Sequence, residues 1–447
     1  MTLLYTQGFE GYDVGGGITA LQKDFMHNTN TAGAEAGLIA GRNGYGIAAF
    51  AADNQNSFTG LWGHYIPTAG LSSEDDWIVG LAFYSNNSEF INSGGSRAPV
   101  IQFADSDGLA ILTVYVASGT LNVRIGNSLT SGTKLGFANV LMTTKVWHYI
   151  ECKVKFATGA TGSVVLHVDE EEVMNVSSVV TSTSDIRPSM ICVGGGTQNN
   201  NFRVDDIYIC DDLGTVNNTF LGDVRIEKLT PTSNGTTSDF VGSDADSTDN
   251  YLLVDDVITV TGTATGGGTS TLVDTALTEA DDFWNGKLLK LHDISTDEDF
   301  EVTVTAFVAS SDTITFTPAL SNAVVSGDTY SLGYLGSDDD TTYVESKVAG
   351  IKDTYAFTNS ATTTPAEIVA VSVKSNVRKS DAGSRTFVHV AKNGTTTNEL
   401  DSASLYPSVT YRYMESIFEL DPNDGVTPIT WTRTEVDAAE FGYKVAT

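Results

Sequence analysis

The chain is poor in cysteine, in basic residues and in long apolar runs, and each shortage excludes a class of protein. Its three cysteines, Cys152, Cys192 and Cys210, lie in apolar strand patterns. Because their number is odd and their spacing does not suit a metal, they indicate small buried residues and not a disulfide framework. No run approaches membrane-spanning length, and the opening MTLLYTQGFEG lacks a secretory signal pattern. We therefore expect assembly in a cytosol without membrane insertion.

Basic residues are outnumbered, with 24 Lys and Arg against 56 Asp and Glu, a formal net charge of −32. Such a charge repels nucleic acid and anionic membranes, so neither is an expected partner. Two readings stay open. The favoured one is that negative charge keeps a protein with many sheet edges soluble, and the other is binding of divalent cations.

A long helical period is also absent, whereas the composition is that of an all-β protein. The 43 glycines separate short runs of Val, Ile, Thr, Phe and Tyr, as in sheets joined by many turns. At 447 residues the chain exceeds the usual size of one core, so two or three domains are expected.

The segment 147–156 shows the strand pattern most clearly, because its residues alternate with a period of two. Its expected dry face is Ile150, Cys152, Val154 and Phe156, and its expected wet face is Tyr149, Glu151, Lys153 and Lys155. The segment 162–176 then predicts a hairpin with an acidic tip at 169–172.

The segment 203–210 is apolar on both faces, which predicts a central strand that is covered on two sides. Val204, Tyr208 and Cys210 are expected on one face, and Ile207 and Ile209 on the other. Earlier strands are expected at 36–51, 76–85, 98–105, 109–118 and 120–127. Their regular spacing predicts a β-sandwich that spans residues 1–217.

These motifs resemble a known fold family. A strand that opens with Trp147, a hairpin with an acidic turn, a Gly-rich strand end and the run FRVDDIYICDD are similar to the concanavalin A-like lectin and laminin-G type jelly roll. The opening MTLLYTQGFEGYD resembles the start of such domains in virion proteins of tailed bacteriophages.

The second half of the chain is expected to hold two further domains. Residues 257–334 resemble small β-barrel modules of phage structural proteins, and similar acidic segments flank them. We therefore predict a discontinuous C-terminal β-sandwich, made of 218–256 and 335–447, that the barrel interrupts. Its terminal segments resemble uncharacterised phage virion proteins.

The sequence predicts no catalytic residues. Glycosidases with this jelly roll place the pattern Glu-x-Asp-x-x-Glu on one strand. The nearest match begins at His167, and its acids fall in the predicted turn, where carboxylates face water. No serine or histidine has the context of a nucleophile or of a metal ligand pair. The chain is therefore predicted not to be an enzyme.

Two kinds of binding site stay open as alternatives to structural roles. Calcium could bind at Asp205 and Asp206 or in the oxygen-rich loop with Asp244, Asp246 and Asp249, although structural or solvated aspartates are the favoured reading. A sugar ring could stack on Trp62, Tyr65, Trp77 or Trp147, although core packing is the default for such side chains.

The resemblance implies a non-enzymatic structural component of a tailed-phage virion, tail-associated, fibre-like or displayed on the surface. A host-receptor protein that binds a surface glycan is the alternative, and a glycan-degrading enzyme the third. By the same resemblance we expect a homotrimer that contacts other virion proteins, assembled in the host cytoplasm and located in the virion.

Overall fold

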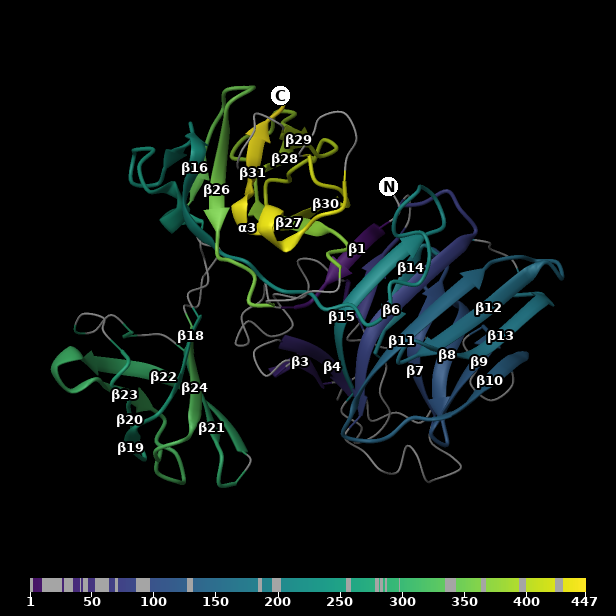
Figure 1. Ribbon diagram of the computed structural model, residues 1–447, viewed down its shortest axis with the longest axis horizontal. Helices are drawn as coiled ribbons and strands as arrows, with labels where there is room; N and C mark the ends of the chain where they lie inside the picture. Colours follow the sequence, from purple (N-terminus) through teal and green to yellow (C-terminus); the bar gives the residue numbers. More distant parts are fainter. Residues whose placement is uncertain are drawn as a thin grey trace. The chain divides into compact units, whose positions relative to one another are not determined.

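A computed structural model of the chain consists almost wholly of β-strands, which confirms the predicted all-β fold (Figure 1). It describes residues 3–9, 26–27, 35–40, 42, 47–52, 64–68, 71–85, 97–126, 132–183, 187–194, 202–254, 259–277, 281, 284–285, 288–296, 298–333, 343–362, 367–393, 399–422 and 429–447. No helix in these ranges is long and apolar enough to cross a membrane.

The chain divides into two compact units, and each is described by itself. Unit 1 contains residues 1–229, 235–237 and 347–447, and unit 2 contains residues 230–234 and 238–346. The three-domain boundaries expected from the sequence stay a prediction.

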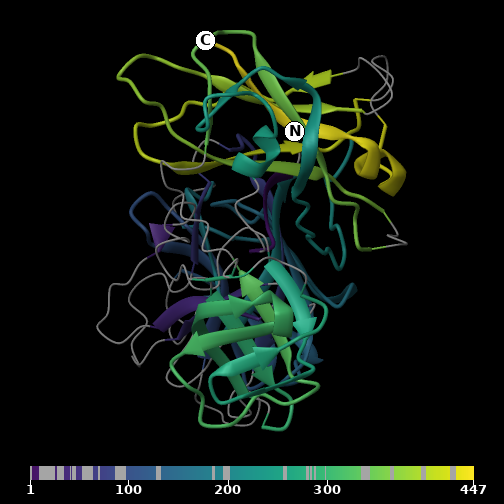
Figure 2. The same cartoon turned by 90° about the vertical axis from the view of Figure 1, so that its left-hand side faces the viewer.

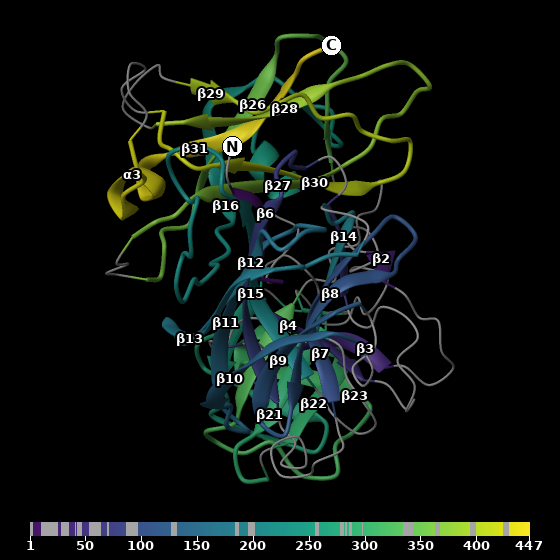
Figure 3. The ribbon, with the colours of Figure 1, turned by 90° about the vertical axis from the view of Figure 1, so that its right-hand side faces the viewer.

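Two antiparallel sheets form the jelly roll of unit 1. Sheet A has the order β13 (Glu171–Val179), β12 (Gly162–Val168), β11 (Trp147–Lys155), β6 (Asp76–Ser85), β15 (Phe202–Asp211), β4 (Ile47–Ala52) and β3 (Glu35–Ala40), with β1 (Leu3–Gln7) paired to β15. Sheet B has the order β10 (Lys134–Leu141), β9 (Thr120–Ile125), β8 (Ala110–Ala117), β7 (Arg97–Ala104), β14 (Met190–Val193), β5 (His64–Pro67) and β2 (Met26–His27). Figure 3 shows β11, β12 and β13 in one layer and β7, β8 and β14 in the other.

The inner faces of the two sheets enclose the main core, because apolar residues recur at every second strand position. Ile150, Cys152 and Val154 of β11 lie in this core, as the alternation predicted. The predicted acidic hairpin is β12 and β13. Its turn residues, Asp169 and Glu170, both have positive φ, which is the backbone geometry that joins two strands tightly.

One prediction about β15 was wrong. Val204 was expected on the face of Tyr208 and Cys210, but it lies in the main core with Ile207 and Ile209. The reason is a β-bulge between Asp205 and Tyr208, which shifts the register against β6 by one residue.

The expected wet face of sheet A is also covered, so that expectation was wrong for its centre. Tyr149 and Glu151 are each 1% exposed. Tyr149 belongs to a second apolar cluster with Ile78, Ala82, Tyr208 and Cys210, and against this cluster pack Phe220, Leu221, Val224, Val369, Ala370 and Ile417. Segments far along the chain thus complete this side of the jelly roll.

The C-terminal part of unit 1 is a smaller β-structure. One sheet has the order β16 (Pro231–Ser238), β26 (Lys352–Phe357), β31 (Glu440–Val445), β28 (Phe387–Lys392) and β29 (Glu399–Asp401), and residues 235–237 of β16 belong to unit 1. A second pair is β27 (Val371–Val377) with β30 (Arg412–Phe418). Helix α3 (Arg433–Ala438) begins at a capping box of Thr432 and Glu435. Trp431 and Phe441 lie in the core of this part.

Unit 2 is built around a seven-stranded sheet, whose green strands face the viewer in Figure 2. The order is β18 (Thr259–Thr263), β24 (Thr329–Gly333), β21 (Leu288–Asp293), β22 (Glu298–Val308), β23 (Thr313–Thr317), β20 (Thr271–Val273) and β19 (Gly266–Gly268). Smaller elements are β17 (Val241–Gly242), β25 (Val344–Glu345), η1 (Asn250–Leu253) and η2 (Ala309–Ser311). Trp284 is fully buried in its core. This unit holds 21 of the acidic residues and only two lysines, so negative charge is concentrated in it.

Candidate functional site

The outer face of sheet A, which points away from sheet B, gathers polar and aromatic side chains in rows across the strands. One row, here called the aromatic row, consists of Trp147 on β11, Tyr84 on β6 and Arg203 on β15, which are direct cross-strand partners. The rings of Trp147 and Tyr84 have centroids 5.3 Å apart, and the Arg203 guanidinium carbon lies 5.0 Å from the Tyr84 centroid. All three side chains are half-buried, so part of each is exposed.

A second row, here called the acid–base row, consists of His167 on β12, Glu151 on β11 and Tyr208 on β15. Strand β6 lies between β11 and β15, and at this level it carries Gly80, the cross-strand partner of both Glu151 and Tyr208. Because glycine has no side chain, the Tyr208 ring lies over β6 and its hydroxyl donates to Glu151 Oε1 at 2.5 Å. His167 Nδ1 lies 3.9 Å from Glu151 Oε2.

The acid–base row lies beneath a segment that we call the strap, residues 213–229. It connects β15 to β16 and belongs to no sheet. The ring of Phe220 stacks on His167 with centroids 4.0 Å apart. The backbone N–H of Leu221 donates to Tyr208 Oη at 3.2 Å, and that of Gly222 donates to Glu151 Oε1 at 2.9 Å. Burial holds the pKa of the Tyr208 hydroxyl well above its usual range, with the Glu151 charge acting in the same direction.

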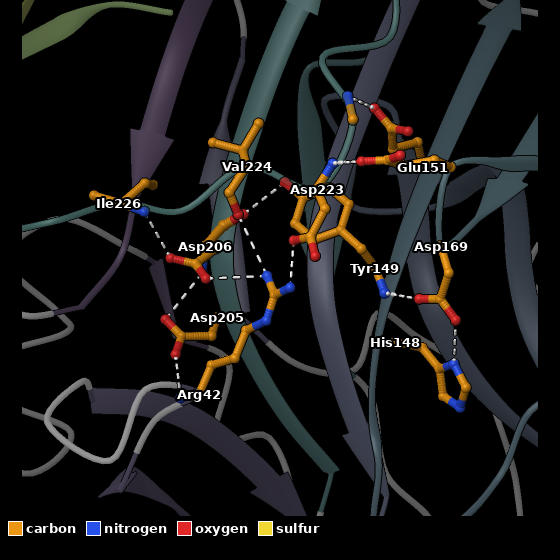
Figure 4. Close-up of polar contacts among 12 residues, drawn as sticks. Arg42, His148, Tyr149, Glu151, Asp169, Asp205, Asp206, Asp223, Val224 and Ile226 are labelled. Carbon is orange, nitrogen blue, oxygen red and sulfur yellow. Dashed lines mark hydrogen bonds and ion pairs between the residues drawn. The ribbon is translucent and has the colours of Figure 1, made fainter. Parts of the chain in front are cut away.

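A buried charged cluster fixes the far end of the strap (Figure 4). The side chain of Arg42 is 8% exposed, contacts Asp206 at 3.3 Å, pairs with Asp223 and donates to the Val224 carbonyl at 3.3 Å. The N–H of Ile226 donates to Asp206 Oδ1 at 2.9 Å. The guanidinium also lies over the Tyr149 ring, 5.5 Å from its centroid. Arg42 thus ties β15 to the strap.

The adjacent carboxyl groups of this cluster have raised pKa values. Burial, followed by the charge of Asp206, raises the pKa of Asp205 to about 8, although it accepts from the N–H groups of Arg42 and Asp206. Burial likewise raises the pKa of Asp206 to about 6, against the opposing Ile226 N–H and Arg42 charge. Burial thus favours the protonated form of the pair in the folded chain.

This pair predicts that unit 1 loses stability as the pH rises. A carboxyl whose pKa is higher in the folded chain binds its proton more tightly there, so its contribution is complete below about pH 4 and is lost as the pH rises through about 8. We expect the Tm to fall by roughly 5 °C between about pH 6 and about pH 9. The Asp205→Asn variant should lose most of this dependence in calorimetry. An equal fall in both proteins would contradict the assignment.

A separate contact steadies the acidic hairpin, also drawn in Figure 4. His148 Nδ1 lies 2.7 Å from Asp169 Oδ2, and the Tyr149 N–H donates to Asp169 Oδ1 at 2.8 Å. The Thr143 N–H donates to His148 Nε2, so the ring hydrogen is on Nδ1 and donates to Asp169. This arrangement holds the turn in place, a role for Asp169 that the sequence did not predict.

In the C-terminal part, the ring of His389 contacts two serine hydroxyls. Ser375 Oγ lies 2.7 Å from His389 Nε2, and Ser416 Oγ lies 2.8 Å from its Nδ1. Burial lowers the pKa of His389 to about 3, and the hydrogen-bond partners of its ring among the described residues are serine hydroxyls, not carboxylates. We therefore interpret it as a satisfied core histidine and not as a general base.

The predicted sugar-stacking residues fall in different places. Trp62 lies outside the described residues, and the side chain of Tyr65 on β5 does as well. Trp77 is fully buried in the main core, where its indole N–H donates to the Glu74 carbonyl at 3.0 Å, so it cannot stack on a ligand. Trp147 lies in the aromatic row. Tyr84 and Arg203 were missed because their alignment with Trp147 depends on strand register.

The predicted calcium ligands make protein contacts. Asp205 and Asp206 belong to the charged cluster around Arg42. In unit 2, Asp244 accepts from the Asp246 N–H and Asp246 from the Thr248 N–H, whereas Asp249 precedes η1 in a left-handed conformation. Across the described ranges, no three His, Cys, Asp or Glu side chains gather as metal ligands. Calcium binding stays a prediction.

Comparison with known proteins found similarity only to solved structures. No protein family model matches the chain, and no curated protein matches it. Among solved structures, an endo-β-1,4-glucuronan lyase from the fungus Trichoderma reesei is 14% identical over 47% of this chain and 95% of its own, with a TM-score of 0.33. An alginate lyase from Aplysia kurodai is 11% identical over 47% and 99%, with a TM-score of 0.34. A carbohydrate esterase of the Shiga toxin-encoding bacteriophage phi24B is 14% identical over 47% and 98%, with a TM-score of 0.32.

These matches contradict two predictions from the sequence. The chain was expected to be a non-enzymatic structural component of a virion, and it was expected not to be an enzyme. The matched structures are instead lyases and an esterase of carbohydrates. Both predictions are withdrawn. The lyase and esterase activities are those of the matched proteins.

Proposed function

We propose that the jelly roll of unit 1 binds a polysaccharide on the outer face of sheet A, at the aromatic row. The supporting observation is the side-by-side placement of two half-buried rings and a guanidinium on one sheet face. The aliphatic faces of a sugar ring pack on aromatic rings, while Arg203 provides a planar fork of N–H donors for its oxygens. A few polar groups set among aromatic side chains are typical of small-ligand sites.

The test compares polysaccharide binding of the wild-type chain with that of Trp147→Ala and Tyr84→Ala. Affinity electrophoresis in gels that contain neutral or anionic polysaccharides, followed by calorimetry on the best ligand, measures the binding. We expect each variant to bind about tenfold more weakly, since loss of one stacked ring removes roughly 1.4 kcal/mol.

A matched control is Phe137→Ala. Phe137 is an aromatic residue of β10 in sheet B that is 53% exposed and contacts the Lys134 ammonium. Its loss should leave binding unchanged. The proposal fails if no polysaccharide binds, or if all three variants bind like the wild type.

Carbohydrate processing is a second candidate, which the neighbouring acid–base row favours. Glu151 bonds to the Tyr208 hydroxyl and lies 3.9 Å from His167, and groups of these three types can transfer protons to and from a sugar. With the strap in place, the Tyr208 hydroxyl is buried and is a weak proton donor. Release of new reducing ends from the bound polysaccharide would reveal this activity. Loss of that release in the Glu151→Gln variant would assign the activity to the acid–base row.

The wider setting is proposed from the sequence resemblance alone. We propose that the chain belongs to a tailed-bacteriophage particle, that its glycan lies on the host surface and that it forms a homotrimer with other virion proteins as neighbours. Mass spectrometry of purified particles tests the location, and light scattering tests the trimer.

A further inference from the structure

The strap covers the part of the outer face that carries the acid–base row. Glu151 is one of its contacts and is 1% exposed, although the strand alternation places it on the outer face. The strap supplies what this carboxylate needs, because the Gly222 N–H and the Tyr208 hydroxyl both reach Oε1. A buried carboxylate without such donors would be costly.

The chemistry of these contacts matches that of a sugar ligand. Phe220 lays a flat ring on His167, and two consecutive N–H groups, of Leu221 and Gly222, reach the row as hydrogen-bond donors. A sugar residue likewise presents a flat ring face and hydroxyl donors. The strap thus occupies the space and satisfies the polar groups that a sugar would use beside the aromatic row.

The strap is attached to this face by side-chain packing and by hydrogen bonds from its backbone, and it pairs with no strand of the described sheets. The Phe220 side chain is half-buried, and Asp223 is 36% exposed where it pairs with Arg42. Phe220 packs against the apolar cluster around Tyr208, but it is not fully buried there. A segment of this kind can leave a surface at lower cost than a strand of the sheet.

We propose that the strap is an intramolecular mimic of the ligand, and that a long polysaccharide displaces its residues 220–223 to reach the acid–base row. This inference rests on the proposed function, since the displacing ligand is the polysaccharide of the aromatic row. The closed strap lowers the apparent affinity, because only the open fraction of molecules offers the full face. Loosening the strap therefore strengthens binding.

The experiment uses the full chain with Phe220→Ala and, separately, Asp223→Asn. Both variants should bind the polysaccharide about fivefold more tightly than the wild type, because the open fraction is larger. Hydrogen exchange of the Leu221 and Gly222 amides should be faster in both, and polysaccharide should accelerate it in the wild type. Phe137→Ala is the control and should change neither measurement. Thermal melting confirms that the variants are folded.

The outcomes separate the two proposals. If Trp147→Ala weakens binding while the two strap variants bind no more tightly, the polysaccharide site stands and the strap inference is overturned. Slower amide exchange at 221–222 on addition of polysaccharide would also overturn it, since the ligand would then bind over a closed strap. If no variant and no wild-type chain binds, both proposals fall.

Discussion

Replacement of Arg42 by alanine is expected to lower the free energy of unfolding of unit 1 by about 3 to 5 kcal/mol. The Arg42 side chain is nearly buried. It forms ion pairs with Asp206 and Asp223 and donates a hydrogen bond to the Val224 carbonyl. Its loss leaves Asp206 buried without its cation and releases the far end of the strap. Removal of one member of a buried ion pair costs far more than removal of an exposed one, because the partner stays out of water.

Urea unfolding followed by tryptophan fluorescence measures this effect, and Arg385→Ala is the matched control. Arg385 pairs with Asp381 at 3.1 Å, but both side chains are largely exposed, at 43% and 50%. The control should cost less than about 1 kcal/mol. Equal losses in the two variants would show that the Arg42 cluster contributes no more than a surface pair.

Replacement of Gly80 by alanine is expected to cost about 3 kcal/mol, at the upper end of the usual range for overpacking. A Cβ atom at this position would lie 2.0 Å from Cε1 of Tyr208, whose ring is held above β6 by its bond to Glu151. Something must move, and the ring cannot leave without breaking the acid–base row. The same unfolding measurement tests this prediction.

Two comparisons isolate the clash from the general effect of adding a methyl group. Gly159→Ala should change stability by less than about 0.5 kcal/mol, because nothing lies within 4 Å of a Cβ built there. In a Tyr208→Ala background, Gly80→Ala should cost under about 1 kcal/mol, since the ring is gone. A full penalty in that background would contradict the assigned cause.

Sequence periodicity was sufficient to predict the sandwich and the inner face of its strands. Ile150, Cys152 and Val154 lie in the core because alternation is a local property of a strand. The bulge at Asp205 was not predictable in this way, since one irregular residue reverses the faces of all positions on one side of it.

The candidate site was harder to predict than the fold because its rows run across strands. Trp147 could be chosen from the sequence, but its neighbours Tyr84 and Arg203 lie 63 and 56 positions away, and only strand register brings them together. The sequence of the strap is typical of a polar linker. Its apolar residues show no helix or strand periodicity that would predict their packing on Tyr208. Hydrophobic periodicity does not predict that an irregular segment will bury a sheet face.

The covered face of sheet A also determines which fragments of the chain can be produced in soluble form. A fragment that ends at residue 217, where the sequence suggests a boundary, keeps every strand of both jelly-roll sheets. It lacks Phe220, Leu221 and Val224 as well as the later residues that pack there, so the apolar surface around Ile78 and Tyr208 would face water. A bare patch of that kind promotes aggregation. An expression boundary after residue 229 retains the strap but still lacks Val369, Ala370 and Ile417, so the jelly roll should be purified together with residues 347–447.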